Sequence, residues 1–236
     1  MSLDPGKTAL VVGGTSGIGL ATARSLASAG VTVFVAGRDR GRADTAAVSL
    51  GNGAGGLALD LAAPASIAAA LAGLPPVDYV VLCAMERDGN HVRTYDADRA
   101  TRSVLVKLVG YVEVLHALGD RLTPAASVLI YGGAAYQRPT AGSVTTAALG
   151  AGVIGLARSL CVQLAPVRVN VIHPGVVDGT GLRSIWGQDK IDAVVERTPI
   201  GRLVTVAEVV EAGLALMSNP AVNGASLVVD GGWLSL

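Results

Sequence analysis

Three glycines near the start of the chain, Gly13, Gly17 and Gly19, have a spacing suited to a backbone that closes around an anion. The apolar run at residues 8–12 is typical of a buried strand, and a helical pattern begins at Leu20. In this context glycines allow a sharp turn and a close approach to a pyrophosphate, which the helix N-terminus would hold. A simple tight turn is the alternative interpretation. The residues of this turn that are predicted to bind a cofactor are Gly13, Thr15, Ser16, Gly17, Ile18 and Gly19.

The residues after the second predicted strand bear on which dinucleotide would bind. Gly37 stands at the strand end, where an acidic residue would bind the ribose 2′-hydroxyl of NAD, and Arg38 follows it. A guanidinium pairs with phosphate through its planar fork, so Arg38 favours NADP(H) over NAD(H). Alternatively, Arg38 and Asp39 are solvated residues, with Asp39 near the N-cap of the next helix.

Strand-like and helix-like segments alternate along the whole chain, and they must position these residues. Strands are predicted near residues 7–12, 31–37, 55–59, 77–83, 126–131, 166–172 and 225–230. Helices are predicted near residues 17–29, 40–50, 64–72, 98–121, 142–164 and 205–218. Regular alternation of continuous apolar strands with helices indicates an α/β fold with a doubly wound parallel sheet covered on both faces. Residues 1–236 read as a single domain.

Composition excludes several classes of function. The 236 residues carry 18 basic and 18 acidic side chains, so charge gives no reason to expect nucleic acid or a membrane surface as partner. Apolar stretches are interrupted well before the length of a membrane span. Cys83 and Cys161 are expected to be buried thiols, which together with the absence of a signal-like N-terminus favours a cytoplasmic protein. No metal-ligand cluster is predicted.

The pattern Gly13-x-x-x-Gly17-x-Gly19 resembles that of the short-chain dehydrogenase/reductase family, and later motifs extend the resemblance over roughly residues 5–234. Pro174-Gly175 is similar to the turn beneath the nicotinamide, and residues 176–204 would form a substrate lid. The resemblance implies a Rossmann domain with a seven-stranded parallel sheet. It also implies cofactor contacts from Asp60, Leu61, Ala84, Pro174, Gly175 and Val177.

Asp60 ends the third predicted strand, and two roles stay open for it. The resemblance implies that its carboxylate meets the adenine amino group. The alternative is a turn or N-cap-like role before Pro64.

The same resemblance implies that the catalytic residues are replaced. Lys107, Gly133, Thr146 and Gly150 stand where the family has Asn, Ser, Tyr and Lys. In the family, the Lys lowers the Tyr pKa and the phenol exchanges a proton with the substrate oxygen. Thr146 is far less acidic than a phenol, and Gly150 carries no charge.

Lys107 and Tyr136 are the candidates for substitute catalytic groups. Lys107 lies in an apolar helical run, and its ammonium is predicted to enter the space that Gly150 leaves; a snorkelling side chain is the alternative. Tyr136 would face the same cleft, unless it lies at the surface. His173 is expected to make local hydrogen bonds rather than act as a catalyst.

Three functions remain open at this stage. The first is an NADP(H)-binding protein without normal carbonyl or alcohol oxidoreductase activity. The second is an NADP(H)-dependent oxidoreductase with a rebuilt proton relay, and the third is a non-redox cyclase or isomerase. The ligand would be an unidentified small molecule. Low charge and the glycine-rich helix at residues 142–164, together with the family's habit, favour a homo-oligomer, a dimer or tetramer built on that helix and residues 98–121.

Overall fold

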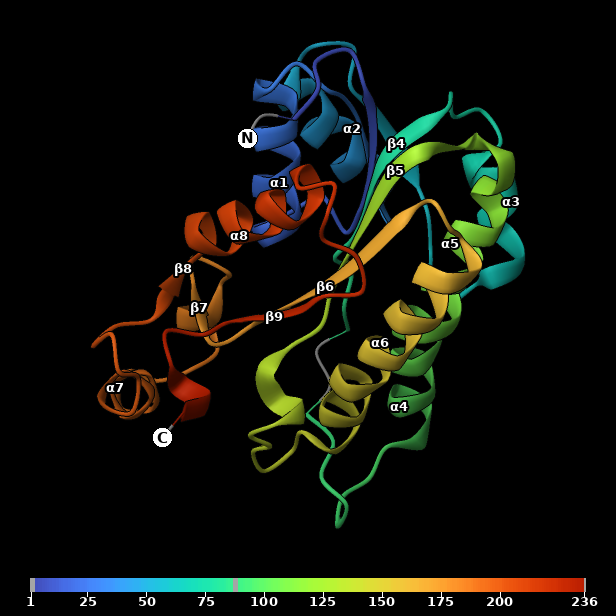
Figure 1. The fold of residues 1–236 in the computed structure, drawn as a ribbon. Helices are drawn as coiled ribbons and strands as arrows, with labels where there is room; N and C mark the ends of the chain where they lie inside the picture. The colour runs from blue at the N-terminus through green and yellow to red at the C-terminus, as the bar shows by residue number, and fades with distance from the viewer. Residues whose placement is uncertain (1–2, 87–88, 236) are drawn as a thin grey trace.

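The computed structural model describes residues 3–86 and 89–235 and shows a seven-stranded, wholly parallel sheet (Figure 1). The strand order is β3-β2-β1-β4-β5-β6-β9, which reverses direction between β1 and β4. A ligand crevice at the carboxyl ends of the strands is expected at such a reversal. The strands are β1 Thr8–Val12, β2 Thr32–Gly37, β3 Gly55–Ala58, β4 Val77–Leu82, β5 Leu122–Tyr131, β6 Arg168–Pro174 and β9 Ser226–Val229.

Helices cover both faces of this sheet, as Figure 1 shows. One face carries α1 (Gly17–Ser28), α2 (Arg40–Leu50) and α8 (Val206–Ser218). The other carries α3 (Ile67–Leu71), α4 (Ala97–Val104), α5 (Gly110–Leu118) and α6 (Val144–Gln163). Because the side chains of each strand alternate between the faces, the buried apolar residues form two separate clusters, one under each helical layer.

The predicted fold class is therefore confirmed, with differences at element boundaries. The helix predicted at residues 98–121 is α4 and α5 joined through one π-helical turn, Leu105–Val109, and it ends in a 3-10 turn, Gly119–Arg121. Strand β5 begins at Leu122, four residues before the predicted start.

The segment predicted as a lid contains structure that the apolar pattern does not reveal. It holds the short helix α7 (Gln188–Glu196) and strand β7 (Val177–Asp178), which pairs with β8 (Val204–Thr205) in a separate two-stranded sheet. The remaining 3-10 turns are Pro64–Ser66, Ala134–Tyr136, Leu182–Ser184 and Trp233–Ser235.

Helix α6 alone, among the described residues, is long and apolar enough to cross a membrane by length and composition. It packs against β6, and its Val153, Ala157 and Leu160 belong to the apolar cluster beneath it. These contacts are those of a core helix.

The amino end of β4 holds a buried carboxylate that is fully partnered. Asp78 is 8% exposed and accepts hydrogen bonds from the Lys7 ammonium at 3.1 Å, the Thr8 amide at 3.0 Å and the Thr123 hydroxyl at 3.0 Å. Burial acts to raise the pKa of Asp78, but these hydrogen bonds together outweigh it and leave the pKa below its usual value.

Candidate functional site

In the turn between β1 and α1, two of the three predicted glycines stand where a side chain has no room. Gly13 has a φ of +85°, and a Cβ there would lie 2.5 Å from the Ala84 amide nitrogen. A Cβ on Gly19 would collide with the Gly13 carbonyl oxygen. Gly17 adopts a φ of +54° and faces open space. Gly13 and Gly19 therefore allow the turn to pack closely on neighbouring backbone, and Gly17 leaves the backbone bare toward open space.

The N-terminus of α1 opens on a broad groove of about 560 Å³. Ser16, the N-cap residue, makes no side-chain capping hydrogen bond, so it does not occupy the first amides of α1. The groove is bordered by Gly17 and Arg24 from α1 and by Asp178 and Gly179 from the lid segment. Sequence reasoning missed Arg24, although it lies two helical turns beyond Gly17 on the same face of α1.

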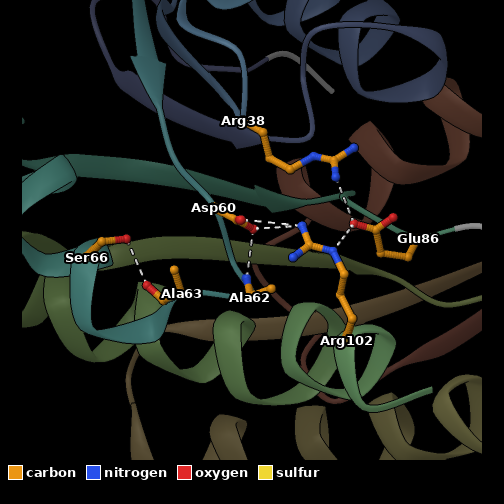
Figure 2. Close-up of polar contacts among 7 residues, drawn as sticks. All are labelled: Arg38, Asp60, Ala62, Ala63, Ser66, Glu86 and Arg102. Atoms are coloured by element: carbon orange, nitrogen blue, oxygen red, sulfur yellow. Dashed lines mark hydrogen bonds and ion pairs between the residues drawn. The ribbon is translucent and has the colours of Figure 1, made fainter. Parts of the chain in front are cut away.

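A chain of charged side chains crosses the crevice beside the ends of β2 and β3 (Figure 2). The Arg38 guanidinium pairs with the Glu86 carboxylate at 3.1 Å. The Arg102 guanidinium pairs with Glu86 at 3.0 Å and with Asp60 at 3.2 Å. Two arginines thus share one carboxylate.

The local roles of Asp39 and Asp60 correspond to the alternatives that the sequence left open. Asp39 caps α2, where its carboxylate accepts a hydrogen bond from the Arg42 amide at 2.8 Å. Asp60 accepts one from the Ala62 amide at 3.0 Å, which makes it a turn residue (Figure 2). Its contact with an adenine stays a prediction.

Thr15 and the residues around Ala84 complete this end of the crevice. The Thr15 methyl packs so closely on Gly37 that a Cβ at Gly37 would lie 2.7 Å from it. The Ala84 carbonyl accepts a hydrogen bond of 2.5 Å from the Tyr111 hydroxyl. Leu61 is buried in the apolar cluster, where only its backbone could contact a ligand.

The predicted nicotinamide turn lies at the end of β6. Pro174 is the last residue of that strand, and a Cβ on Gly175 would lie 2.7 Å from the Asp230 side chain. Val177 is buried in β7, which begins the lid segment. Their contact with a cofactor stays a prediction.

A small cavity of about 30 Å³ brings together the four positions that are predicted to replace the family's catalytic residues. Lys107, Gly133, Thr146 and Gly150 all line it, and Met85, Glu86, Ser103, Gly132 and Leu149 complete its walls. A volume of this size holds about two water molecules. The cavity is the space in which the family resemblance locates proton transfer.

Lys107 is buried in this cavity rather than snorkelling to solvent. It is 6% exposed and lies on the π-helical turn between α4 and α5. Among the described residues its amine has neither a hydrogen-bond partner nor a carboxylate partner, and it lies 5.6 Å from the centroid of the Tyr111 ring. Burial lowers the pKa of Lys107 to about 8, although Cys83 opposes this shift.

Ser103 is a member of this site that sequence reasoning missed. It is 2% exposed, and its hydroxyl has no hydrogen-bond partner among the described residues. Ser103 precedes Lys107 by four residues, a spacing that places both on one face of a helix. That spacing could have been noticed in the sequence.

Tyr136 lies beside the cavity but is not among the residues that line it. Its Cβ would lie 3.2 Å from a Cβ at Gly150, and its ring packs on His173 with 4.6 Å between centroids. His173 is fully buried and accepts a hydrogen bond from the Gly133 amide through Nδ1 at 3.2 Å. Burial lowers the pKa of His173, with the nearby Lys107 contributing, so the ring is neutral.

The bare backbone at Gly17, the groove beside it and the guanidinium groups of Arg38 and Arg102 suit a dinucleotide phosphate. The cavity fits the family's carbonyl chemistry less well, because no phenol lines it and position 133 is a glycine rather than a serine. Among the described residues, no cluster of metal-ligating side chains occurs.

Comparisons with known proteins agree with this architecture. A family model described as enoyl-(acyl carrier protein) reductase matches residues 12–234. D-threitol dehydrogenase of Mycolicibacterium smegmatis is 30% identical, covering 97% of this chain and 93% of its own length. A protein of Xanthobacter autotrophicus named inactive 2-(S)-hydroxypropyl-CoM dehydrogenase 2 is also 30% identical, covering 91% of this chain and all of its own.

Solved structures show the same relationship. A short chain dehydrogenase/reductase family protein superimposes with a TM-score of 0.89 at 28% identity, over 100% of both chains. A structure described as a putative betaketoacyl-ACP reductase gives a TM-score of 0.86 at 29% identity, over 98% of this chain and 99% of the other. With a matching family model over nearly its full length, the chain belongs to the short-chain dehydrogenase/reductase family.

Proposed function

We propose that this protein binds NADP(H) in the crevice of its Rossmann domain and lacks the carbonyl or alcohol oxidoreductase activity that is usual in its family. The observation that carries this proposal is the composition of the 30 Å³ cavity. Lys107, Gly133, Thr146 and Gly150 surround it, and none can act as the phenol acid of the family's mechanism.

The preference for NADP(H) rests on the two guanidinium groups at the adenosine end. Arg38 and Arg102 already hold one anionic group between them, the Glu86 carboxylate (Figure 2). A ribose 2′-phosphate carries more charge and more acceptor oxygens than a carboxylate, so it would replace Glu86 on Arg38. NADH lacks that phosphate and would gain nothing from this exchange.

Calorimetric titration with NADPH and NADH tests the preference. Arg38→Ala should weaken NADPH binding roughly tenfold and leave NADH binding nearly unchanged, because one charge-assisted contact is lost. Glu86→Gln should strengthen NADPH binding, since a competing carboxylate is removed. Arg40→Ala is the matched control, because Arg40 is equally exposed but pairs with Asp44. Equal losses for both cofactors, or no binding of either, would refute the preference.

The loss of ordinary activity is supported by chemistry and by one relative. Carbonyl reduction without a positioned acid loses on the order of 10² to 10⁴ in rate. A relative 30% identical to this chain is itself named an inactive dehydrogenase, although others are named as reductases.

NADPH oxidation over a panel of carbonyl compounds tests this part of the proposal. The expected result is no turnover above background by the natural chain. A fourfold variant, Lys107→Asn with Gly133→Ser, Thr146→Tyr and Gly150→Lys, should gain activity. A Cβ at Gly133 meets open space, whereas one at Gly150 would press on Tyr136 and the Gly133 carbonyl. Robust turnover by the natural chain would favour a rebuilt proton relay instead.

We also propose a homo-oligomer, which is supported by exposed apolar side chains on the segments predicted to form its interface, residues 98–121 and 142–164. Val104, Val109 and Val112 lie along α4, the π-helical turn and α5, and Val144 and Val162 lie near the two ends of α6. Exposed apolar surface can mark an interface between subunits. Light scattering at micromolar concentration should give the mass of a dimer or tetramer, and a monomer mass would contradict the proposal.

A further inference from the structure

We propose that Lys107 is a nucleophilic amine that captures a small uncharged aldehyde or ketone in its cavity as a reversible imine. The inference rests on the cavity alone and does not require that a cofactor binds. It assigns the cavity a ligand chemistry that carbonyl reduction does not use.

The surroundings of Lys107 are those of an activated amine rather than of a structural ion pair. A lysine buried without a carboxylate partner loses the stabilisation of its ammonium form. The nearest negative charge on the cavity wall, Glu86, is already held by Arg38 and Arg102. The other titratable groups around Lys107 are Cys83, Tyr111 and His173, and none of them is a carboxylate. Desolvation in an apolar pocket is one of the ways by which proteins make a lysine nucleophilic.

The cavity is shaped for a neutral ligand. Backbone amides are the usual partners of a bound anion, but those of Gly132 and Gly133 are taken by the Ile172 carbonyl and by His173. What remains beside Lys107 is the buried, unpartnered hydroxyl of Ser103. One hydroxyl and one amine suit the oxygen and the carbon of a carbonyl group, respectively.

The cavity is large enough for a carbonyl group and for little more. Gly133 and Gly150 contribute no side chain to the cavity, so about 30 Å³ stays open beside the amine. The carbonyl end of a ligand fits this volume, and the rest would extend past Met85, which is exposed at the rim.

The proposed step balances without any further reactant. The neutral Lys107 amine adds to the carbonyl carbon, and a proton moves from nitrogen to oxygen to give a carbinolamine. Loss of the oxygen as water leaves a carbon–nitrogen double bond. The Ser103 hydroxyl can donate a hydrogen bond to the departing oxygen, while hydrolysis reverses the sequence and releases the ligand.

Reductive trapping tests the proposal, because lysine occurs at only three positions of the sequence, 7, 107 and 190. The intact protein is incubated with acetone and cyanoborohydride near pH 8, digested and mapped by mass spectrometry. Trapping adds the mass of acetone less one oxygen atom. Lys107 should be labelled at least tenfold faster than Lys7, whose pKa is raised by Asp78, and faster than the exposed Lys190. Its rate should rise with pH, reach about half of its maximum near pH 8 and level off above that value.

Two variants separate chemistry from folding. Ser103→Ala should slow the labelling of Lys107 while leaving that of Lys7 and Lys190 unchanged, a change that damaged folding would not produce. Lys107→Arg should lose the label altogether. Labelling of Lys107 no faster than of Lys190 in the folded protein would overturn the proposal. So would stabilisation by acetate without ketone labelling, which would assign the cavity to an anion.

Discussion

A buried residue with an ionisable side chain lies near each end of β4, and the surroundings of the two residues are opposite in kind. At the amino end, Asp78 receives three hydrogen bonds, one of them from an ammonium group. Near the carboxyl end, Lys107 is just as buried but has no such partner among the described residues. A buried charge stabilises a fold only when it is partnered, so Asp78 is a structural group. Lys107 costs stability, as expected for a group whose role is the ligand chemistry proposed above.

The largest predicted effect on stability is that of replacing Asp78. Asp78→Ala should lower the free energy of unfolding by about 2–3 kcal/mol, because the Thr8 amide and the Thr123 hydroxyl lose their acceptor in a buried setting. Urea denaturation at pH 7 measures this loss. Asp78→Asn is the control that keeps the shape and removes the charge, and its loss should be smaller.

The pH dependence of this contribution has a defined sign. The pKa of Asp78 is lower in the folded protein than its usual value near 4, so its contribution is present above that value. It is lost as the pH falls through the lower pKa of the folded state. The difference between Asp78→Ala and the natural protein should therefore narrow in acid, and a difference within about 0.5 kcal/mol at pH 7 would contradict a structural role.

Replacing Lys107, near the carboxyl end of β4, should change the free energy of unfolding in the opposite direction. Lys107→Met keeps a long unbranched side chain and removes the buried amine, so it should raise the free energy of unfolding at pH 7 by about 1–3 kcal/mol. The pKa of Lys107 falls from its usual 10.5 to about 8 on folding, so the unfolded chain binds the extra proton. Burial of the Lys107 ammonium therefore destabilises the natural protein fully below pH 8, and this destabilisation disappears as the pH rises towards 10.5.

Denaturation of Lys107→Met at pH 7 and at pH 10 measures this change. The gain should be large at the lower pH and small at the higher one. Lys190→Met is the matched control, since Lys190 is exposed and should show no change at either pH. An equal destabilisation by Lys107→Met at both values would mean that the lysine stem packs structurally, and the comparison between the two ends of β4 would fail.

The sequence was sufficient for the fold because the signals that determine it are local. Apolar runs such as residues 8–12 and the glycine turn at Gly13 specify strand, turn and helix without knowledge of distant contacts. Helix α7 was not predicted, because a short helix in a polar segment has little apolar periodicity.

The site was only partly predictable, for a physical reason. Arg38 and Lys107 were singled out by residue type, but their environments depend on segments far away in the chain. Glu86 lies 48 residues from Arg38, and its pairing follows from the position of the loop after β4. Burial of Lys107 likewise depends on how closely α6 packs against the π-helical turn. Neither the pairing of Glu86 with Arg38 nor the packing of α6 against the π-helical turn is encoded in a local sequence pattern.

The smallest predicted effect on stability is at a carboxylate that has partners but is exposed. It tests whether burial accounts for the large effect expected at Asp78. Thr205 and Glu208 form a capping box at the start of α8, and Arg202 also pairs with Glu208. Arg202 and the Thr205 hydrogen bonds lower the pKa of Glu208 to about 2. Because water competes for these groups, the cap should be worth less than the buried partners of Asp78. Thr205→Ala should lower the free energy of unfolding by about 1 kcal/mol, and Thr205→Ser should restore most of it. A loss as large as that of Asp78→Ala, measured in the same urea titration, would show that burial is not what separates these sites.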